Sequence, residues 1–394
     1  MHPEPGTLPP GRQELSMTDA ANVPGQTGFH IDRGTCFVLF AYDIARSVDL
    51  TRAERRITAI TERSRLKHKR RAPAYFDYTP APLRITADVD PIAIGQYRTG
   101  PVVDMLLYDF GGVCVSYSLP LQGPFSSLEL LSQDLYENAA LLSDSRRRIE
   151  ELLTGLGDAA ERPHIADFVE DYVILHIEQA TPALAPDTLL TGFAQPLARL
   201  LRSETLELAD QQVHDSLNQR ISFGSDDVAI IDWNATLIYG RDMEDVVAVI
   251  EFANVELLEM RFLDQQLDLA LDQAYQASSL RRWDRPWFPG APRANVRRIA
   301  QLQVDGAILF EQVTNTLKLF GDQYLARVHR LLSQRFHLES WDASITRKLH
   351  TLDSIYGKMT ESAASWRMEV LEWIIIVLIT ISIVVSFLPG LAGH

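Results

Sequence analysis

The sequence predicts an α+β (mixed α/β) soluble head, then a long helical, coiled-coil-like stalk, then a single C-terminal transmembrane helix. Short apolar runs separated by turn residues fill the first part, and helical patterns are interleaved with them. From about residue 242, apolar residues recur at alternating steps of four and three, which is typical of packed long helices. The chain then ends on an apolar run. These patterns divide the chain into a disordered tail (1–28), the head (29–240), the stalk (241–372) and the span (373–392).

The overall charge and the cysteines narrow the classes of function. The 394 residues carry a formal net charge of −15, which argues against a general nucleic-acid binder. Cys36 and Cys114 lie in apolar runs without CxxC spacing, so we expect buried thiols in a reducing compartment rather than a disulfide or zinc site. The proline-rich start lacks the basic residues and apolar middle of a signal peptide, which favours a disordered tail.

In the first half of the head, the sequence predicts strands with one helix between them. GTCFVLFAYDI (34–44) is rich in aromatic and β-branched residues, as in a buried strand, and LRITADV (83–89) alternates like a half-buried one. Between them, TRAERRITAITERSRLKHKRR (51–71) has a helical pattern. DMLLYDFGGVCVSYSLPL (104–121) predicts two strands around the glycines 111 and 112.

The second half of the head mixes helices and strands. Residues 126–156 predict one helix that begins near Ser126 and stops at one of the glycines 155 and 157. DYVILHIEQ (171–179) predicts a strand, a pair of helices follows over about 186–218, and RISFGSDDVAIIDWNATLIYG (220–240) predicts two short strands.

Three long helices are predicted in the stalk, interrupted by the proline-rich RRWDRPWFPGAP (281–292). The first and third carry the four-three spacing, which is typical of a coiled-coil seam between copies, while a helical bundle within one chain stays an alternative. The middle helix, about 293–336, has a wider apolar stripe. Asp264 is the one polar residue in the first series, where it either fixes register or oligomer state or lies exposed. The candidate oligomer seam comprises Asp264, Ile345, Leu349, Leu352, Tyr356, Met359 and Trp366.

The apolar end of the chain predicts a tail anchor in a lipid bilayer. A helix needs about 20 residues to cross a bilayer, which 373–392 supplies; a buried core helix is the alternative. Lys358 and Arg367 precede the run, so the head is expected to face the cytoplasm from the inner membrane, or the matrix in a mitochondrion. The candidate anchor residues are Trp373, Ile374, Ile375, Ile376, Leu378, Ile381, Val384, Phe387 and Leu388.

Lysines and arginines concentrate in residues 52–71, against the acidic balance of the whole chain. This segment predicts contact with an anionic partner, either RNA phosphates, as in a ribosome, or anionic lipid. Neutralisation by the protein's own acids, or a solvated helix face, is the alternative. The candidate binding residues are Arg63, Arg65, Lys67, Lys69, Arg70 and Arg71.

The sequence carries no familiar catalytic or metal-binding motif. The sequence contains no glycine-rich phosphate loop, GxSxG, HExxH or zinc spacing, so we expect no enzyme, no cofactor and no metal. His176 and Glu178 share one face of a predicted strand, and we interpret them as a satisfied pair rather than metal ligands. Asp226 and Asp227 are interpreted as turn residues rather than cation ligands.

Two stretches resemble a known family. LLYDFGGVCVSYSL is similar to a strand pair, and WRMEVLEWIIIVLITISIVV to the C-terminal signature, of the "required for meiotic nuclear division" family of tail-anchored membrane proteins. The resemblance covers about residues 30–390 and implies a non-enzymatic inner-membrane protein that forms large assemblies and supports organellar translation. The chain departs from the family at residues 115–117 and at Ser382, where members often carry a glutamate inside the span.

These observations lead us to expect a tail-anchored, homo-oligomeric scaffold that organises a partner, such as the translation machinery, at the inner membrane. The alternative from another class is a subunit of a CorA-like cation channel, which also combines an α/β head, long helices and C-terminal membrane helices. A hydrolase with an unrecognised site is a more remote alternative.

Overall fold

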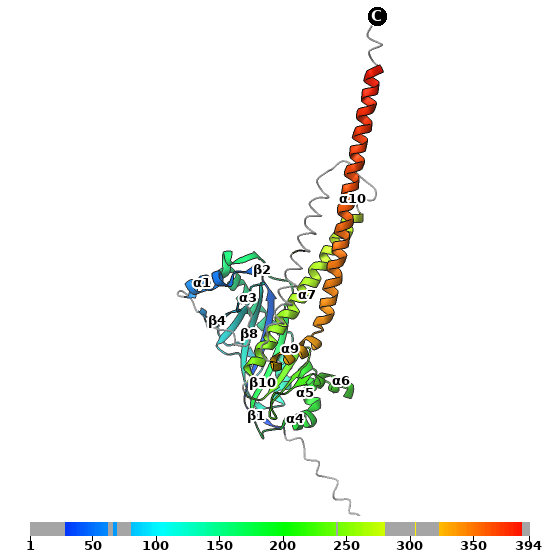
Figure 1. Ribbon diagram of the computed structural model, residues 1–394. Coiled ribbons are helices and arrows are strands. Elements are labelled where there is room, and N and C mark those ends of the chain that lie inside the picture. The colour runs from blue at the N-terminus through cyan, green and yellow to red at the C-terminus, as the bar shows by residue number, and fades with distance from the viewer. Residues whose placement is uncertain are drawn as a thin grey trace, which may run out of the picture.

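A computed structural model describes residues 28–61, 66–68, 80–241, 243–279, 304 and 323–387 (Figure 1). The predicted disordered tail lies outside these residues except for its last position, and so does most of the predicted middle helix of the stalk.

A nine-stranded sheet forms the centre of the head (Figure 1). Its strands are antiparallel to their neighbours except for β10 and β13, which run parallel. Two short two-stranded sheets, β2–β9 (Ala45–Val48 and Ala160–Pro163) and β5–β6 (Ala93–Ile94 and Tyr97–Arg98), lie outside it. The order of the main sheet is β11 (Arg220–Ile221), β12 (Val228–Ile231), β13 (Ala235–Tyr239), β10 (Glu170–Thr181), β1 (His30–Asp43), β8 (Gly112–Pro124), β7 (Val102–Leu107), β4 (Leu83–Asp88) and β3 (Leu66–His68).

Both faces of the sheet are covered, and for this reason the middle of β1, residues 36–42, is apolar at every position. Along β1, Val38 and Phe40 point into one core while Leu39 and Ala41 point into the other. The first core is completed by α1 (Leu50–Thr61), α2 (Ser127–Leu135), α3 (Ala139–Leu156), α4 (Pro186–Gly192), α5 (Ala194–Arg202) and α6 (Asp210–Asn218). The second is completed by α7 (Glu244–Ser279) and α9 (Gln323–Arg335). The mixed α+β class predicted for the head is confirmed.

The hairpin predicted around the two glycines is present. Leu107 of β7 pairs with Val113 of β8 across it. Gly111 has a φ of +101°, and a Cβ at this position would lie 1.7 Å from the carbonyl oxygen of Ala45. Glycine is therefore required here both by the backbone conformation and by the approach of the neighbouring strand.

Several element predictions in the head were wrong in detail. The helix predicted over 51–71 ends at Thr61, and Leu66–His68 is instead the edge strand β3, because Lys67 pairs with Thr86 of β4. The single helix predicted over 126–156 is two, since Asn138 begins a new helix and its side chain accepts a hydrogen bond from the Leu141 amide at 3.0 Å. The pair of helices over 186–218 is three, and residues 220–240 hold three strands rather than two.

Two long helices extend from the head and lie side by side (Figure 1). The first half of α7 belongs to the head, because Val246–Leu258 pack on the second face of the sheet. From Met260 onward, α7 packs along α10 (Leu338–Phe387), which starts directly after α9 and runs in the same direction as α7. The predicted boundary at residue 241 lies three residues before α7 begins at Glu244, and the first half of α7 packs with the head rather than in the stalk.

Within the described residues, no helix is both long enough and apolar enough to cross a bilayer.

Candidate functional site

The far end of α10 is apolar and exposed. Every side chain described over 371–384 is exposed, and the fraction is 67% for Trp373 and 49% for Ile374. Six consecutive apolar residues, 374–379, cover more than one full turn of the helix, so no side of it is polar there. Of the candidate anchor residues, the side chains of Phe387 and Leu388 lie outside the described part. The exposed ones are Trp373, Ile374, Ile375, Ile376, Leu378, Ile381 and Val384.

The two hydroxyl side chains of this run are Thr380 and Ser382. The hydroxyl of Thr380 donates a hydrogen bond to the carbonyl oxygen of Ile376, one turn earlier, at 2.7 Å. This bond satisfies the hydroxyl inside the helix, so the run can enter an apolar environment without leaving that donor unpaired.

Below the apolar end, α10 packs on α7 through a buried apolar seam. Ile345 and Leu352 are fully buried, and Leu349 packs beside them. Their partners on α7 include Leu263 and Leu267 of the same chain. These three candidate seam residues are therefore already covered within one chain.

Asp264 lies in this contact and has two partners on α10. Its carboxylate is 2.8 Å from Nζ of Lys348 and accepts a hydrogen bond from Ser344 at 3.0 Å. Lys348 also reaches Asp268 at 2.6 Å. Burial lowers the pKa of Lys348, but the hydrogen bonds to both aspartates outweigh it, so the pKa is raised. Asp264 is therefore paired with α10 of the same chain and not exposed, while a role in fixing register stays a prediction.

The remaining candidate seam residues lie further along α10. Tyr356 is half-buried, and the side chains of Met359 and Trp366 lie outside the described part. The described part of α7 reaches Ser279 while α10 continues to Phe387, and a seam between copies at these positions stays a prediction.

Of the six candidate residues for binding an anionic partner, one lies in the described part of the chain. Lys67 lies on the edge strand β3, and the structure does not describe Arg63, Arg65, Lys69, Arg70 and Arg71. Two arginines at the start of the segment pair with acids of the same chain: Arg52 with Asp49 at 3.5 Å, and Arg56 with Asp158. The charges of these two arginines are therefore paired with acids of the same chain, as the alternative interpretation expected.

Three of the other singled-out polar residues have ordinary partners. His176 Nε2 lies 2.9 Å from the carbonyl oxygen of Gly240, while Glu178 pairs with Arg33 at 2.6 Å. Asp227 accepts hydrogen bonds from two backbone amides of its turn, at 2.7 and 2.6 Å. Within the described ranges, no group of three His, Cys, Asp or Glu residues has a geometry that would hold a metal ion. Both cysteines are free and buried, and burial raises their pKa values.

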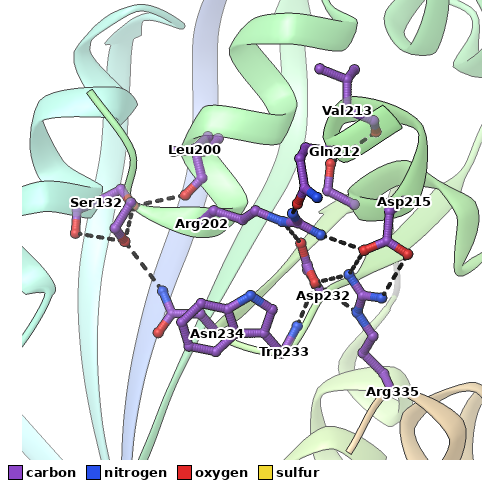
Figure 2. A network of polar contacts seen from close by, with 12 residues as sticks. Ser132, Leu200, Arg202, Gln212, Val213, Asp215, Asp232, Trp233, Asn234 and Arg335 are labelled. Carbon is purple, nitrogen blue, oxygen red and sulfur yellow. Dashed lines mark hydrogen bonds and ion pairs between the residues drawn. The ribbon is translucent and has the colours of Figure 1, made fainter. Parts of the chain in front are cut away.

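A buried ion network, which the sequence analysis missed, fastens α9 to the head (Figure 2). Asp232, in the turn between β12 and β13, is fully buried and pairs with Arg202 of α5 at 2.8 Å and with Arg335 of α9. Asp215 of α6 bridges the same two arginines at 2.6 and 3.3 Å. Hydrogen bonds from Arg202 and then Arg335 lower the pKa of Asp215. Because Arg335 ends α9, the network holds the point from which α10 departs.

A second set of missed residues joins α7 to the head through buried carboxyl groups. Glu256 is 2.8 Å from His329 of α9, and Arg261 pairs with Glu170 of β10. Glu259 lies against Asp43 at the end of β1. No local sequence motif indicates that these residues are paired. The glutamates of α7 stand between apolar residues, as they do in many helices.

The comparisons with known proteins concern the head. A protein described as "Uncharacterized protein MJ0711", from Methanocaldococcus jannaschii, is 23% identical over 221 residues, which is 56% of this chain and 66% of the relative's own length. No solved structure matches. These matches do not bear on the resemblance to the "required for meiotic nuclear division" family, which stays a prediction. The family pattern described as "Uncharacterized protein MJ0711, N-terminal domain" matches residues 33–245, more than half of the chain, and the chain therefore belongs to that family.

Proposed function

We propose that the protein is a non-enzymatic membrane tether, in which the apolar end of α10 enters a lipid bilayer and the head engages a partner at a distance from it. The observation that carries this proposal is the exposure of Trp373–Val384 on all sides of the helix. Transferring an exposed side chain of this kind out of water contributes on the order of 1 kcal/mol, and this run presents at least seven of them.

The pattern of the run favours lipid over a protein groove. A helix that docks into a groove is amphipathic and keeps a polar face toward water. The run 374–379 has no polar face, and the one polar side chain whose contact is described, Thr380, is satisfied within the helix. Lipid tails accept apolar side chains from every direction, so they match this surface better.

The rest of α10 is suited to act as a spacer. Of the 50 residues of α10, the 35 from Leu338 to Glu372 precede the apolar run and correspond to a length of about 50 Å. The contact with α7 and the ion network around Arg335 set the direction in which it leaves the head. A head held in this way is displayed at a defined distance from the membrane surface.

The charges beside the apolar run indicate on which side of the membrane the head lies. The head faces the cytoplasm from the inner membrane, or the matrix in a mitochondrion, because Lys358 and Arg367 precede the apolar run. Copies associate along α10 beyond the end of α7, and the basic segment 52–71 contacts an anionic partner such as ribosomal RNA or lipid.

Flotation with liposomes tests the tether. The full chain is expected to float with the vesicles and to resist extraction by salt, while a chain ending at residue 372 stays at the bottom of the gradient. Ile375→Lys with Ile379→Lys is expected to abolish flotation, and Leu130→Lys, at an exposed leucine of the head, is the matched control and should float. A truncated chain that still floats, or a full chain that does not, would contradict the proposal. Cation flux into the same vesicles would favour the channel alternative instead.

A further inference from the structure

Three titratable residues from distant parts of the chain meet where α7 crosses the end of β1. Asp43 is the last residue of β1, His164 follows β9, and Glu259 lies on α7. Asp43 and Glu259 are buried, with 2% and 1% of their surface exposed, whereas the His164 side chain is partly open to solvent. The site is separate from the apolar end of α10.

The contacts of His164 determine where its protons lie. Its Nδ1 is 3.1 Å from the carbonyl oxygen of Arg162, and because a carbonyl only accepts, Nδ1 must carry a hydrogen. Its Nε2 is 2.9 Å from Oδ1 of Asp43, which also accepts when ionised. A proton on Nε2 makes the ring cationic and pairs it with the Asp43 carboxylate at this distance, although the two atoms do not meet in hydrogen-bond geometry.

A second proton is required between the two carboxyl groups. Glu259 lies against Asp43, and among the described residues neither oxygen of Glu259 meets a donor of the protein. Two carboxylates in contact have no donor between them, so the pair is stable only when it shares a proton. With both protons in place, the three side chains together carry no net charge.

The packing leaves Glu259 little room to turn away. Gly112, at the start of β8, has no side chain, and a Cβ there would lie 2.8 Å from Oε1 of Glu259. The same Cβ would lie 2.8 Å from Val255 on the preceding turn of α7. This close approach keeps the carboxyl group of Glu259 in the interface.

The neighbouring charges on α7 are engaged elsewhere. Glu256 pairs with His329 of α9, and Arg261 pairs with Glu170 of β10. The ring of His164 stacks on Phe262 of α7, with centroids 5.5 Å apart, so α7 contributes an apolar side chain on that side. The charged group that faces Glu259 is thus Asp43. His164 contacts Asp43 and acts on Glu259 only through it.

We propose that Asp43, His164 and Glu259 form a proton-operated latch, which holds α7 against the end of the sheet while the shared protons are bound and loosens it when they are lost. Loss of the carboxyl proton leaves two buried negative charges in contact, and separation of α7 from β1 at this point relieves their repulsion.

The direction of the response follows from the environment of each group. Burial raises the pKa of Glu259 well above its usual range, and the charge of Asp43 raises it further. Burial also raises the pKa of Asp43, although His164 opposes it, and the hydrogen bond to Asp43 raises that of His164. All three groups bind protons more tightly in the folded chain, so the contact weakens as pH rises through these raised values.

Hydrogen–deuterium exchange of the full chain in mild detergent tests the latch. Across a series of pH values from acid to alkaline, and after correction for the intrinsic exchange rate, protection of residues 255–262 should fall about tenfold per pH unit once the shared proton is lost. Protection of β12 and β13 should not change. In a Glu170→Gln background, which removes the titrating partner of Arg261, Glu259→Gln places an amide that donates to Asp43, so the tenfold fall in protection per pH unit should disappear.

Two further variants make the outcome decisive. Asp272→Asn removes an exposed carboxylate from the same helix and should respond to pH as the wild type does. Asp43→Asn removes the second carboxylate and supplies a permanent donor to Glu259, so protection should fall less steeply with pH than in the wild type; this covers the case in which Glu259→Gln does not fold. Flat protection in the wild type would overturn the proposal, as would a loss that also spreads to β12 and β13.

Discussion

Replacing Asp232 by asparagine tests whether the ion network of Figure 2 holds α9 to the head. The carboxylate of Asp232 is fully buried and accepts from Arg202 at 2.8 Å, from Arg335, and from the Trp233 amide at 2.7 Å. Asparagine keeps the shape of the side chain but removes its negative charge. The two arginines, whose side chains are only 10% and 14% exposed, then lose a buried ionic partner.

The loss in the free energy of unfolding depends on the ion pairs that remain after the substitution. Breaking a buried ion pair by removing one partner costs about 3–5 kcal/mol. Asp215 still pairs with both arginines, so we expect the lower end, about 3 kcal/mol, for Asp232→Asn. Asp215→Asn serves as the matched comparison. The side chain of Asp215 is 54% exposed and Asp232 keeps both arginines paired, so the cost should stay below about 1 kcal/mol.

Urea unfolding of the full chain in mild detergent, followed by tryptophan fluorescence, measures both free energies. Hydrogen exchange in α9 locates the effect, because loss of the network should expose the α9 amides before those of the sheet. Equal losses for the two variants, or a loss below about 1 kcal/mol for Asp232→Asn, would refute the reasoning that burial makes this pair strong.

Three other predictions concern packing, backbone and pH. Leu352→Ala removes a fully buried side chain from the α7–α10 seam and should cost about 2–5 kcal/mol in urea unfolding; a cost near zero would mean that the two helices do not pack as described. Gly111→Ala places a Cβ 1.7 Å from the Ala45 carbonyl oxygen at a φ of +101°, so it should cost at least about 2 kcal/mol, measured as a lowered melting temperature. Burial raises the pKa of Glu170 to about 7 although Arg261 lowers it, so the stabilisation from protonating Glu170 is complete below its ordinary pKa and is lost as pH rises toward and through 7. Glu170→Gln should flatten that decline in melting temperature between about pH 5 and pH 8, and an unchanged slope would contradict it.

Local sequence determined the elements whose partners lie nearby or whose pattern is long. The strand in 34–44 follows from its aromatic and β-branched composition, and the β7–β8 hairpin follows from two glycines between apolar runs. The helices α7 and α10 follow from apolar spacing sustained over several turns. The apolar end of α10 is equally evident, because hydropathy is a property of the residues themselves.

Tertiary structure decided what depends on residues far apart in the chain. Residues 66–68 continue a helical pattern, yet they form a strand because the edge of β4 offers backbone partners that outweigh a weak local preference. The spacing of Leu349 on α10 and of Asp264 on α7 fits a partner chain as well as a helix of the same chain, and only the fold places these two helices side by side. Asp43, His164 and Glu259 are separated by about a hundred residues each, so no spacing could bring them together. A buried carboxyl group acquires its chemistry from neighbours and from exclusion of water, and folding alone supplies both.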